Sequence, residues 1–100
     1  MKVPQDIGIL LSEVLRNLGV LDRLGEAKVF QLWGDIVGEE IERVTTPLRV
    51  EGHKLFIGVE NAAWRQELVY SKKELLEKIS EIIGSGIIRD INFTVLRRPR

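Results

Sequence analysis

The sequence of 100 residues contains no cysteine. This absence excludes disulfide bonds, thiolate zinc sites and cysteine nucleophiles. The chain also lacks any apolar run close to the roughly 20 residues that a membrane-spanning helix needs. The apolar stretch at residues 9–11 is too short, and too closely followed by charged residues, for a signal peptide. We therefore expect a cytoplasmic protein with no membrane partner.

An excess of charge of one sign is also lacking, because 15 basic residues balance 15 acidic ones. Proteins dedicated to duplex DNA usually carry a basic excess, since phosphate contacts supply most of their non-specific affinity. Any nucleic-acid binding must then come from a local patch, and we expect it to be weak and salt-sensitive. The length and the ordinary globular composition indicate a single domain over residues 1–100.

Groups suited to catalysis are scarce. The single histidine, His53, has no partner base or nucleophile near it in the sequence. Asp35, Glu39 and Glu42 share one helical face and could hold a hard cation, but carboxylates on helices are more often simply solvated. A phosphate-binding glycine-rich loop is missing. We predict that the protein is not an enzyme and uses no metal or other cofactor.

The middle of the chain predicts a β-hairpin. Residues 48–51 and 54–60 alternate between apolar and polar, which places their apolar side chains on one face of a sheet. Gly52 and His53 between them suit a two-residue type II′ turn. The resulting register has four cross-strand pairs: Glu51–Lys54, Val50–Leu55, Arg49–Phe56 and Leu48–Ile57.

Helical periodicity surrounds this hairpin. Asn61 is a suitable N-cap for one long helix that contains Trp64 and ends at Gly84. On the N-terminal side, the spacing predicts a helix between Asp6, as its N-cap, and Gly19. A connector over residues 21–25 and a second helix over residues 26–45 follow, with Gly38 ending or kinking that helix. Residues 87–96 alternate as a last strand.

These elements predict an α+β domain in the order α-α-β-β-α-β. The simplest packing is a three-stranded mixed sheet with all helices on one face, because neither the hairpin nor the helices can bury an apolar side alone. We expect the last strand to pair antiparallel with the first, so that the second and third strands run parallel on either side of it.

Two groups of residues are candidates for binding. Phe56 and Arg49 lie on the strand face turned away from the helices, where they form either a base-stacking platform or a cross-strand pair that only stabilises the hairpin. Lys54 and the C-terminal Arg97, Arg98 and Arg100 complete the candidate nucleic-acid site. Trp64 lies beside Arg65 where the hairpin meets the helix, and it is either a core anchor with Leu68 or part of a partner contact.

Four short segments, in this order, resemble the DciA family, which is widespread in bacteria as a domain of unknown function. They are residues 33–38 (Trp-Gly-Asp-Ile-Val-Gly), 45–48 (Thr-Thr-Pro-Leu), 52–59 (Gly-His-Lys-Leu-Phe-Ile-Gly-Val) and 63–68 (Ala-Trp-Arg-Gln-Glu-Leu). The resemblance covers nearly the whole chain.

The resemblance implies a KH-like domain that acts in bacterial DNA replication. Proteins of this family look like helicase operators, which engage the DnaB-type replicative helicase, help it to load onto DNA and contact DNA themselves. By position, the resemblance makes Trp33, Gly38 and Pro47 structural. It places Trp64, Glu67 and Leu68 at a partner-binding surface, to which we add the neighbouring Arg65.

Our leading hypothesis is a non-enzymatic adaptor that binds the replicative helicase, with weak affinity for single-stranded or tailed DNA. Two alternatives stay open. One is a small KH-like RNA-binding module. The other is a protein-interaction domain that forms a homodimer through its open sheet face. A steep loss of binding with salt would favour nucleic acid over a protein partner.

Overall fold

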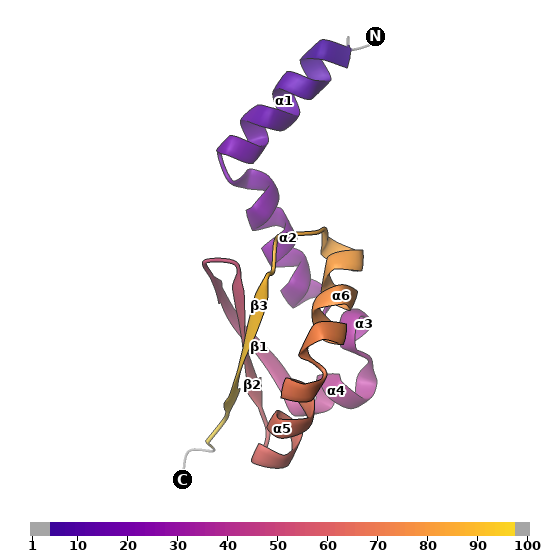
Figure 1. Cartoon of the computed structure of the whole chain (residues 1–100), viewed down its shortest axis with the longest axis vertical. Helices are drawn as coiled ribbons and strands as arrows, with labels where there is room; N and C mark the ends of the chain where they lie inside the picture. Colours follow the sequence, from indigo (N-terminus) through magenta and orange to yellow (C-terminus); the bar gives the residue numbers. More distant parts are fainter. Residues whose placement is uncertain (1–4, 98–100) are drawn as a thin grey trace.

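The computed structural model describes residues 5–97, and it confirms the predicted α+β class with a three-stranded mixed sheet. Figure 1 shows the helices on one side of the sheet and the first helix projecting away from the rest. The elements are α1 (Gln5–Asn17), α2 (Val20–Gln31), α3 (Trp33–Val37), α4 (Glu39–Val44), β1 (Thr45–Glu51), β2 (Lys54–Val59), α5 (Ala62–Tyr70), α6 (Lys72–Ile83) and β3 (Asp90–Val95).

The helices before the sheet differ from the prediction in two places. The predicted connector over residues 21–25 is helical, because Gly19 makes the whole turn with a φ of 72° and α2 already starts at Val20. The predicted second helix is divided at Leu32 and again at Gly38, where a φ of 87° confirms the expected break. The N-cap predicted at Asp6 concerns a side chain outside the described part.

The hairpin has the predicted register next to its turn, where Glu51 pairs with Lys54, and the two following pairs also agree. The turn type was predicted wrongly. Gly52 and His53 both have positive φ, 53° and 64°, which corresponds to type I′ rather than type II′. A type I′ turn matches the right-handed twist of paired strands, and the sheet therefore holds His53 in a conformation that non-glycine residues adopt rarely.

The fourth predicted pair, Leu48 with Ile57, is wrong. Ile57 pairs with Pro47 instead, and the register shifts between Pro47 and Arg49, so that Leu48 is the extra residue of a β-bulge. Leu48 is consequently exposed and does not share the apolar face. Proline lacks the N–H donor that a regular ladder needs, which explains why the irregularity falls here.

The strand order is β1-β2-β3, with β2 antiparallel to β1 and parallel to β3. The expected pairing of the last strand with β1 is therefore wrong, although β2 and β3 do run parallel. Pro47 favours an edge position for β1. Strand β2 has three buried side chains, Leu55, Ile57 and Val59, and is the central strand. The last strand is also shorter than predicted, because residues 87–89 precede β3 as irregular backbone.

The long helix predicted after the hairpin is two helices that meet at Ser71. Its start is confirmed, because Asn61 Oδ1 accepts a hydrogen bond of 2.9 Å from the Trp64 N–H. The apolar stripe is interrupted between Leu68 and Leu75, where the intervening turn carries Ser71 and Lys72. With no core contact to hold that turn in register, the chain bends at Ser71, whose φ is −94° and ψ is 7°.

The core lies between the sheet and the helices. Its buried apolar side chains come from β2, β3, the segment before β3 and helices α2, α3, α5 and α6: Val29, Trp33, Ile36, Val37, Leu55, Ile57, Val59, Leu68, Leu75, Ile79, Ile83, Ile88, Ile91 and Phe93. Val50 of β1 is partly buried against them. Helix α1 contributes no side chain to this cluster.

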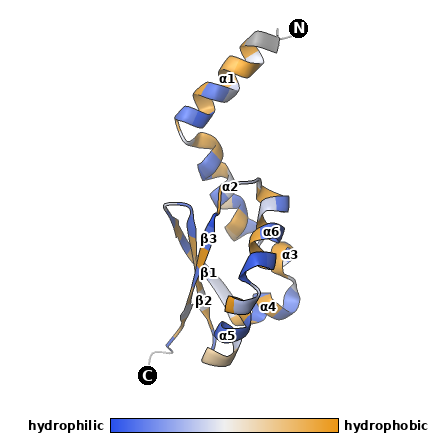
Figure 2. Cartoon of the chain, viewed as in Figure 1, coloured by the Kyte–Doolittle hydropathy of each residue, from blue (hydrophilic) through white to orange (hydrophobic). Residues whose placement is uncertain are grey.

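Helix α1 gives the molecule its elongated shape, with extents of 57 × 23 × 21 Å. Figure 2 shows hydrophobic residues along α1, although it projects beyond the packed body. Within residues 5–97, no helix is long and apolar enough to cross a bilayer.

Candidate interaction surfaces

The predicted stacking pair on the open sheet face is present. The guanidinium carbon of Arg49 lies 4.1 Å from the centroid of the Phe56 ring. Arg49 Nε also donates a hydrogen bond of 2.9 Å to Glu51 Oε1. One face of the ring is thus covered by a cation of the same hairpin, an arrangement that stabilises the strand pair. A nucleic-acid base would have to stack on Phe56 beside or in place of Arg49.

The positive charge of Lys54 is partly offset by a carboxylate, Asp90, which Lys54 shares with Lys72. Lys54 Nζ lies 3.8 Å from Asp90 Oδ2, and Lys72 Nζ lies 3.2 Å from Asp90 Oδ1. A backbone hydrogen bond from Ile91 and the two lysines lower the pKa of Asp90 below its ordinary value. Because this one carboxylate is ionised at neutral pH, it offsets one of the two lysine charges, and the group of Lys54, Lys72 and Asp90 keeps a single positive charge.

Of the three C-terminal arginines, Arg97 lies at the other end of this face. Arg97 is exposed, two residues beyond the end of β3, whereas Arg98 and Arg100 lie outside the described residues. Lys54 is level with Asp90, so Val95 at the end of β3 lies five residues, or roughly 17 Å at about 3.3 Å per residue, further along the sheet, and Arg97 follows two residues later. The sheet therefore brings together Arg49 and Phe56 but spreads the remaining cations along its length.

His53 has a structural role in the described contacts. Its Nδ1 lies 3.1 Å from the carbonyl oxygen of Ile87, and its own carbonyl accepts a hydrogen bond of 2.7 Å from the Arg89 N–H. The histidine thus fastens the hairpin turn to the segment that leads into β3. Among the described residues, no group of three carboxylates or histidines is close enough to hold a metal ion.

Helix α5 is firmly attached along one side. Trp64 is partly buried against the core, and Leu68 is only 2% exposed. On the flank, Arg65 Nε donates a hydrogen bond of 2.8 Å to the carbonyl of Phe93. This bond covers part of the open edge of β3 and fixes the helix to the sheet. Leu68 therefore supports the predicted contact surface from beneath, while Trp64 and Arg65 lie at its margin.

The side of α5 away from the core carries two apolar residues that the sequence analysis missed. Tyr70 is 81% exposed and Val69 is 41% exposed. Tyr70 lies three positions after the exposed Glu67, which makes the two neighbours on the helix surface. The sequence did contain a signal for this surface, because Tyr70 is an aromatic residue that does not fall on the apolar stripe of Trp64 and Leu68. We define the α5 surface as Trp64, Arg65, Glu67, Val69 and Tyr70.

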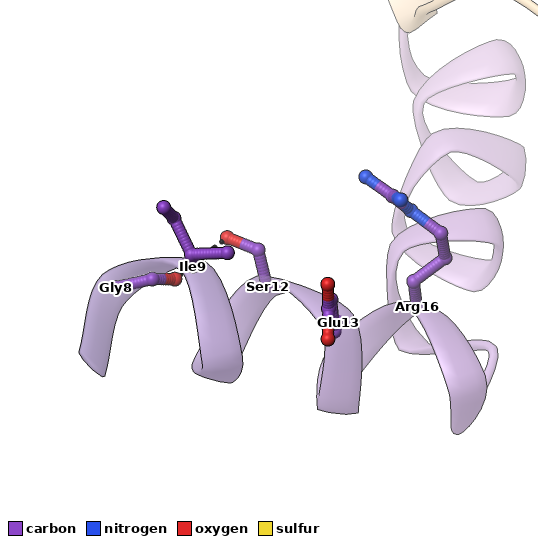
Figure 3. A pocket seen from close by; sticks show the side chains of 5 residues that line it. All are labelled: Gly8, Ile9, Ser12, Glu13 and Arg16. Carbon is purple, nitrogen blue, oxygen red and sulfur yellow. Dashed lines mark hydrogen bonds between the residues drawn. The ribbon is translucent and has the colours of Figure 1, made fainter. Parts of the chain in front are cut away.

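The hollows of the surface are shallow. One of about 660 Å³ lies on α1 and is lined by Gly8, Ile9, Ser12, Glu13 and Arg16, which all belong to this one helix (Figure 3). The Ser12 hydroxyl donates to the Gly8 carbonyl of its own helix. The hollow therefore lacks the convergent polar groups from several elements that shape a small-molecule site.

The fold and these surfaces define a class of protein: a small α+β domain with helices on one face of a mixed three-stranded sheet and a rigid helix that displays an aromatic side chain. The model of the family described as "Dna[CI] antecedent, DciA" matches residues 6–93. The chain belongs to the DciA family.

Several curated relatives bear the name UPF0232 protein. The Rhodococcus jostii protein is 26% identical over 91 residues, which cover 91% of this chain and 48% of the relative. The Mycobacterium ulcerans protein is 28% identical over 91 residues, 91% of this chain and 49% of the relative. The Mycolicibacterium smegmatis protein is 28% identical over 85 residues, 85% of this chain and 44% of the relative. The chain thus spans about half the length of the curated relatives it matches.

Proposed function

We propose that this domain is a non-enzymatic adaptor that binds a DnaB-type replicative helicase in the bacterial cytoplasm and assists its loading onto DNA. Membership of the DciA family supports a role of this kind. Weak binding of single-stranded or tailed DNA is a secondary part of the proposal.

The observation that carries the proposal is the exposure of Tyr70 on a helix that cannot readily move. The opposite side of α5 is anchored by the buried Leu68, and its flank is bonded to β3 through Arg65. Exposed tyrosines on rigid supports are frequent hot spots of protein interfaces, because little conformational entropy is lost when they are buried. The α5 surface is therefore our candidate contact for the helicase.

We expect the affinity of this domain for DNA to be low. Arg49 lies near the carboxylate of Glu51, and Lys54 shares that of Asp90 with Lys72, so only about one of these three positive charges is left for a phosphate backbone. The sequence also contains no Gly-x-x-Gly segment, by which KH domains clamp a nucleic-acid backbone. What supports DNA binding is the Phe56 ring with Arg49 beside it, together with the exposed Arg97.

The test is capture of the purified replicative helicase from the same source by the immobilised chain, with and without single-stranded DNA. We expect capture that survives moderate salt, because the α5 surface is largely apolar and aromatic, whereas DNA binding alone should fall steeply with salt. Absence of capture would overturn the proposal. Tight, salt-sensitive binding of structured RNA in the same assay would favour the RNA-binding alternative.

A further inference from the structure

Helix α1 displays an apolar stripe that the body of the molecule leaves uncovered. Five side chains, spaced by three or four residues along one side of the helix, are each 51–62% exposed: Ile7, Leu10, Leu11, Val14 and Leu18. The stripe continues onto α2 through Leu21 and Leu24, which are 40% and 58% exposed. A lone helix of 13 residues is marginal in water, so a helix of this length normally needs packing along its apolar side.

The opposite side of α1 is the polar side. It carries Ser12, Glu13 and Arg16, which line the hollow in Figure 3 together with Ile9, the one apolar side chain of this side, which is 60% exposed. Helices that lie on membranes are typically rich in lysine and arginine on this side. The sequence of α1 contains a single arginine against Asp6 and Glu13, so the helix has no basic excess to offer to anionic lipids or to a phosphate backbone. The composition of the helix thus favours an apolar protein surface as its occupant.

We propose that the occupant is α1 of a second copy of this chain, packed antiparallel about a two-fold axis at Val14. In this register Val14 of one copy packs against Val14 of the other. Leu10 of each copy, four residues before Val14, then packs against Leu18 of the other copy, four residues after Val14. The stripe is therefore complementary to itself, as an isologous two-fold interface requires. The sequence of α1 carries one net negative charge, from Asp6, Glu13 and Arg16, so the electrostatic repulsion between two copies is small.

The available area is sufficient for a dimer. Each half-exposed leucine, isoleucine or valine can bury on the order of 100 Å². The seven side chains from Ile7 to Leu24 then supply roughly 700 Å² per chain, close to the ~800 Å² per partner of a standard interface. Leu21 and Leu24 also line a hollow of about 380 Å³ on α2, together with Lys28, Gln31, Ile83 and Ile87, which extends the surface toward the body.

The arrangement of the molecule permits this pairing without a clash. Helix α1 projects away from the body, and α5 lies toward the opposite end of the molecule (Figure 1). Two copies joined through antiparallel α1 helices therefore place their bodies at opposite ends. The sheet face and the α5 surface of each copy stay free, so the dimer differs from one formed through the open sheet face.

Sedimentation velocity tests the association. We expect the wild-type mass to rise toward that of a dimer between about 1 and 100 µM, the range of weak specific interfaces. Val14→Glu should keep the chain monomeric throughout, while Ser12→Glu, which adds the same charge on the polar side, should leave the association unchanged. Both positions are exposed, and circular dichroism checks that each variant folds. A monomeric wild-type chain at the highest concentration would overturn the proposal.

Single cysteines test the register, because the natural chain contains none. Under mild oxidation, Val14→Cys should form a disulfide-linked dimer and Arg16→Cys should not. A mixture of Leu10→Cys and Leu18→Cys chains should give mainly the mixed dimer. Efficient Leu10–Leu10 linkage would show a parallel arrangement and overturn the antiparallel one. Loss of helicase capture by Val14→Glu, with a monomeric wild-type chain, would assign the stripe to the helicase instead.

Discussion

The indole Nε1 of Trp33 donates a hydrogen bond of 2.9 Å to the hydroxyl oxygen of Thr45, in the buried interior. The Thr45 hydroxyl donates in turn to the carbonyl of Ile41 at 2.6 Å. This chain of bonds connects α3 and the end of α4 to the first residue of β1. It also joins two of the four segments by which the sequence resembles its family, and so explains physically why a tryptophan and a threonine occur at this separation.

Replacing Thr45 with valine should therefore destabilise the protein by about 1–3 kcal/mol, because the Trp33 N–H would stay buried without an acceptor. Valine preserves the shape and the strand preference of threonine. The matched control is Thr46→Val, at the exposed neighbouring position, which should change the free energy of unfolding by less than about 0.5 kcal/mol. Urea unfolding measures both, and equal stabilities would contradict the assigned role of the bond.

The sequence predicted the elements whose local signals agree with their packing. Alternation identified the hairpin, Asn61 marked the start of α5, and Gly38 marked a break. The strand order was not predictable in the same way, because it depends on which strand can hydrogen-bond to a neighbour along both of its edges. The single proline of β1 was the relevant signal, since Pro47 weakens one strand as a central partner.

The candidate site was predictable in part. The pairing of Arg49 with Phe56 follows from the hairpin register, but the nearby carboxylate of Asp90 depends on β3 lying next to β2, which the sequence did not indicate. Tyr70 was overlooked because a single long helix had been expected. The bend at Ser71 is what ends α5 directly after Tyr70.

Gly38→Ala should lower the stability by about 1–3 kcal/mol. Gly38 has a φ of 87° and a ψ of 161°, a region that is essentially restricted to glycine, while no atom lies close enough to obstruct an added Cβ. Gly8→Ala provides the contrast, because Gly8 is helical and equally unobstructed, so alanine should stabilise α1 by about 0.5–1 kcal/mol. Thermal unfolding of the two variants should thus shift in opposite directions, and shifts in the same direction would count against the backbone argument.

The stability should depend on the ionisation of Asp90. Its pKa is lowered in the folded protein, chiefly by the backbone bond from Ile91 and by Lys72, so the charged form favours folding. This stabilisation is present above the unfolded pKa and is lost as the pH falls below about 4 through the folded value. Asp90→Asn should be less stable than wild type at pH 7 by under about 1 kcal/mol, since the pair is half exposed. The difference in stability between the variant and the wild type should vanish near pH 2, about two units below the ordinary pKa. A difference that does not depend on pH would contradict this role of Asp90.

Phe56→Ala should weaken binding of single-stranded DNA by about 1–3 kcal/mol, the contribution of one lost base stack. Phe56→Leu is the informative companion, because it keeps apolar bulk on the hairpin and removes only the aromatic face. Fluorescence anisotropy with a labelled oligonucleotide should show a similar loss for both variants. Unchanged affinity in both would remove the stacking platform and leave the Arg49–Phe56 pair as a purely structural contact.

The most direct measurement of the central claim is the affinity of the replicative helicase for Tyr70→Ala compared with Glu77→Ala, an exposed position on the neighbouring α6. We predict that Tyr70→Ala weakens helicase binding by at least about tenfold, as expected for an interface hot spot, without loss of folding stability. Glu77→Ala should bind as the wild type does. Equal affinities for the wild type and both variants would contradict the assignment of the α5 surface as the helicase contact.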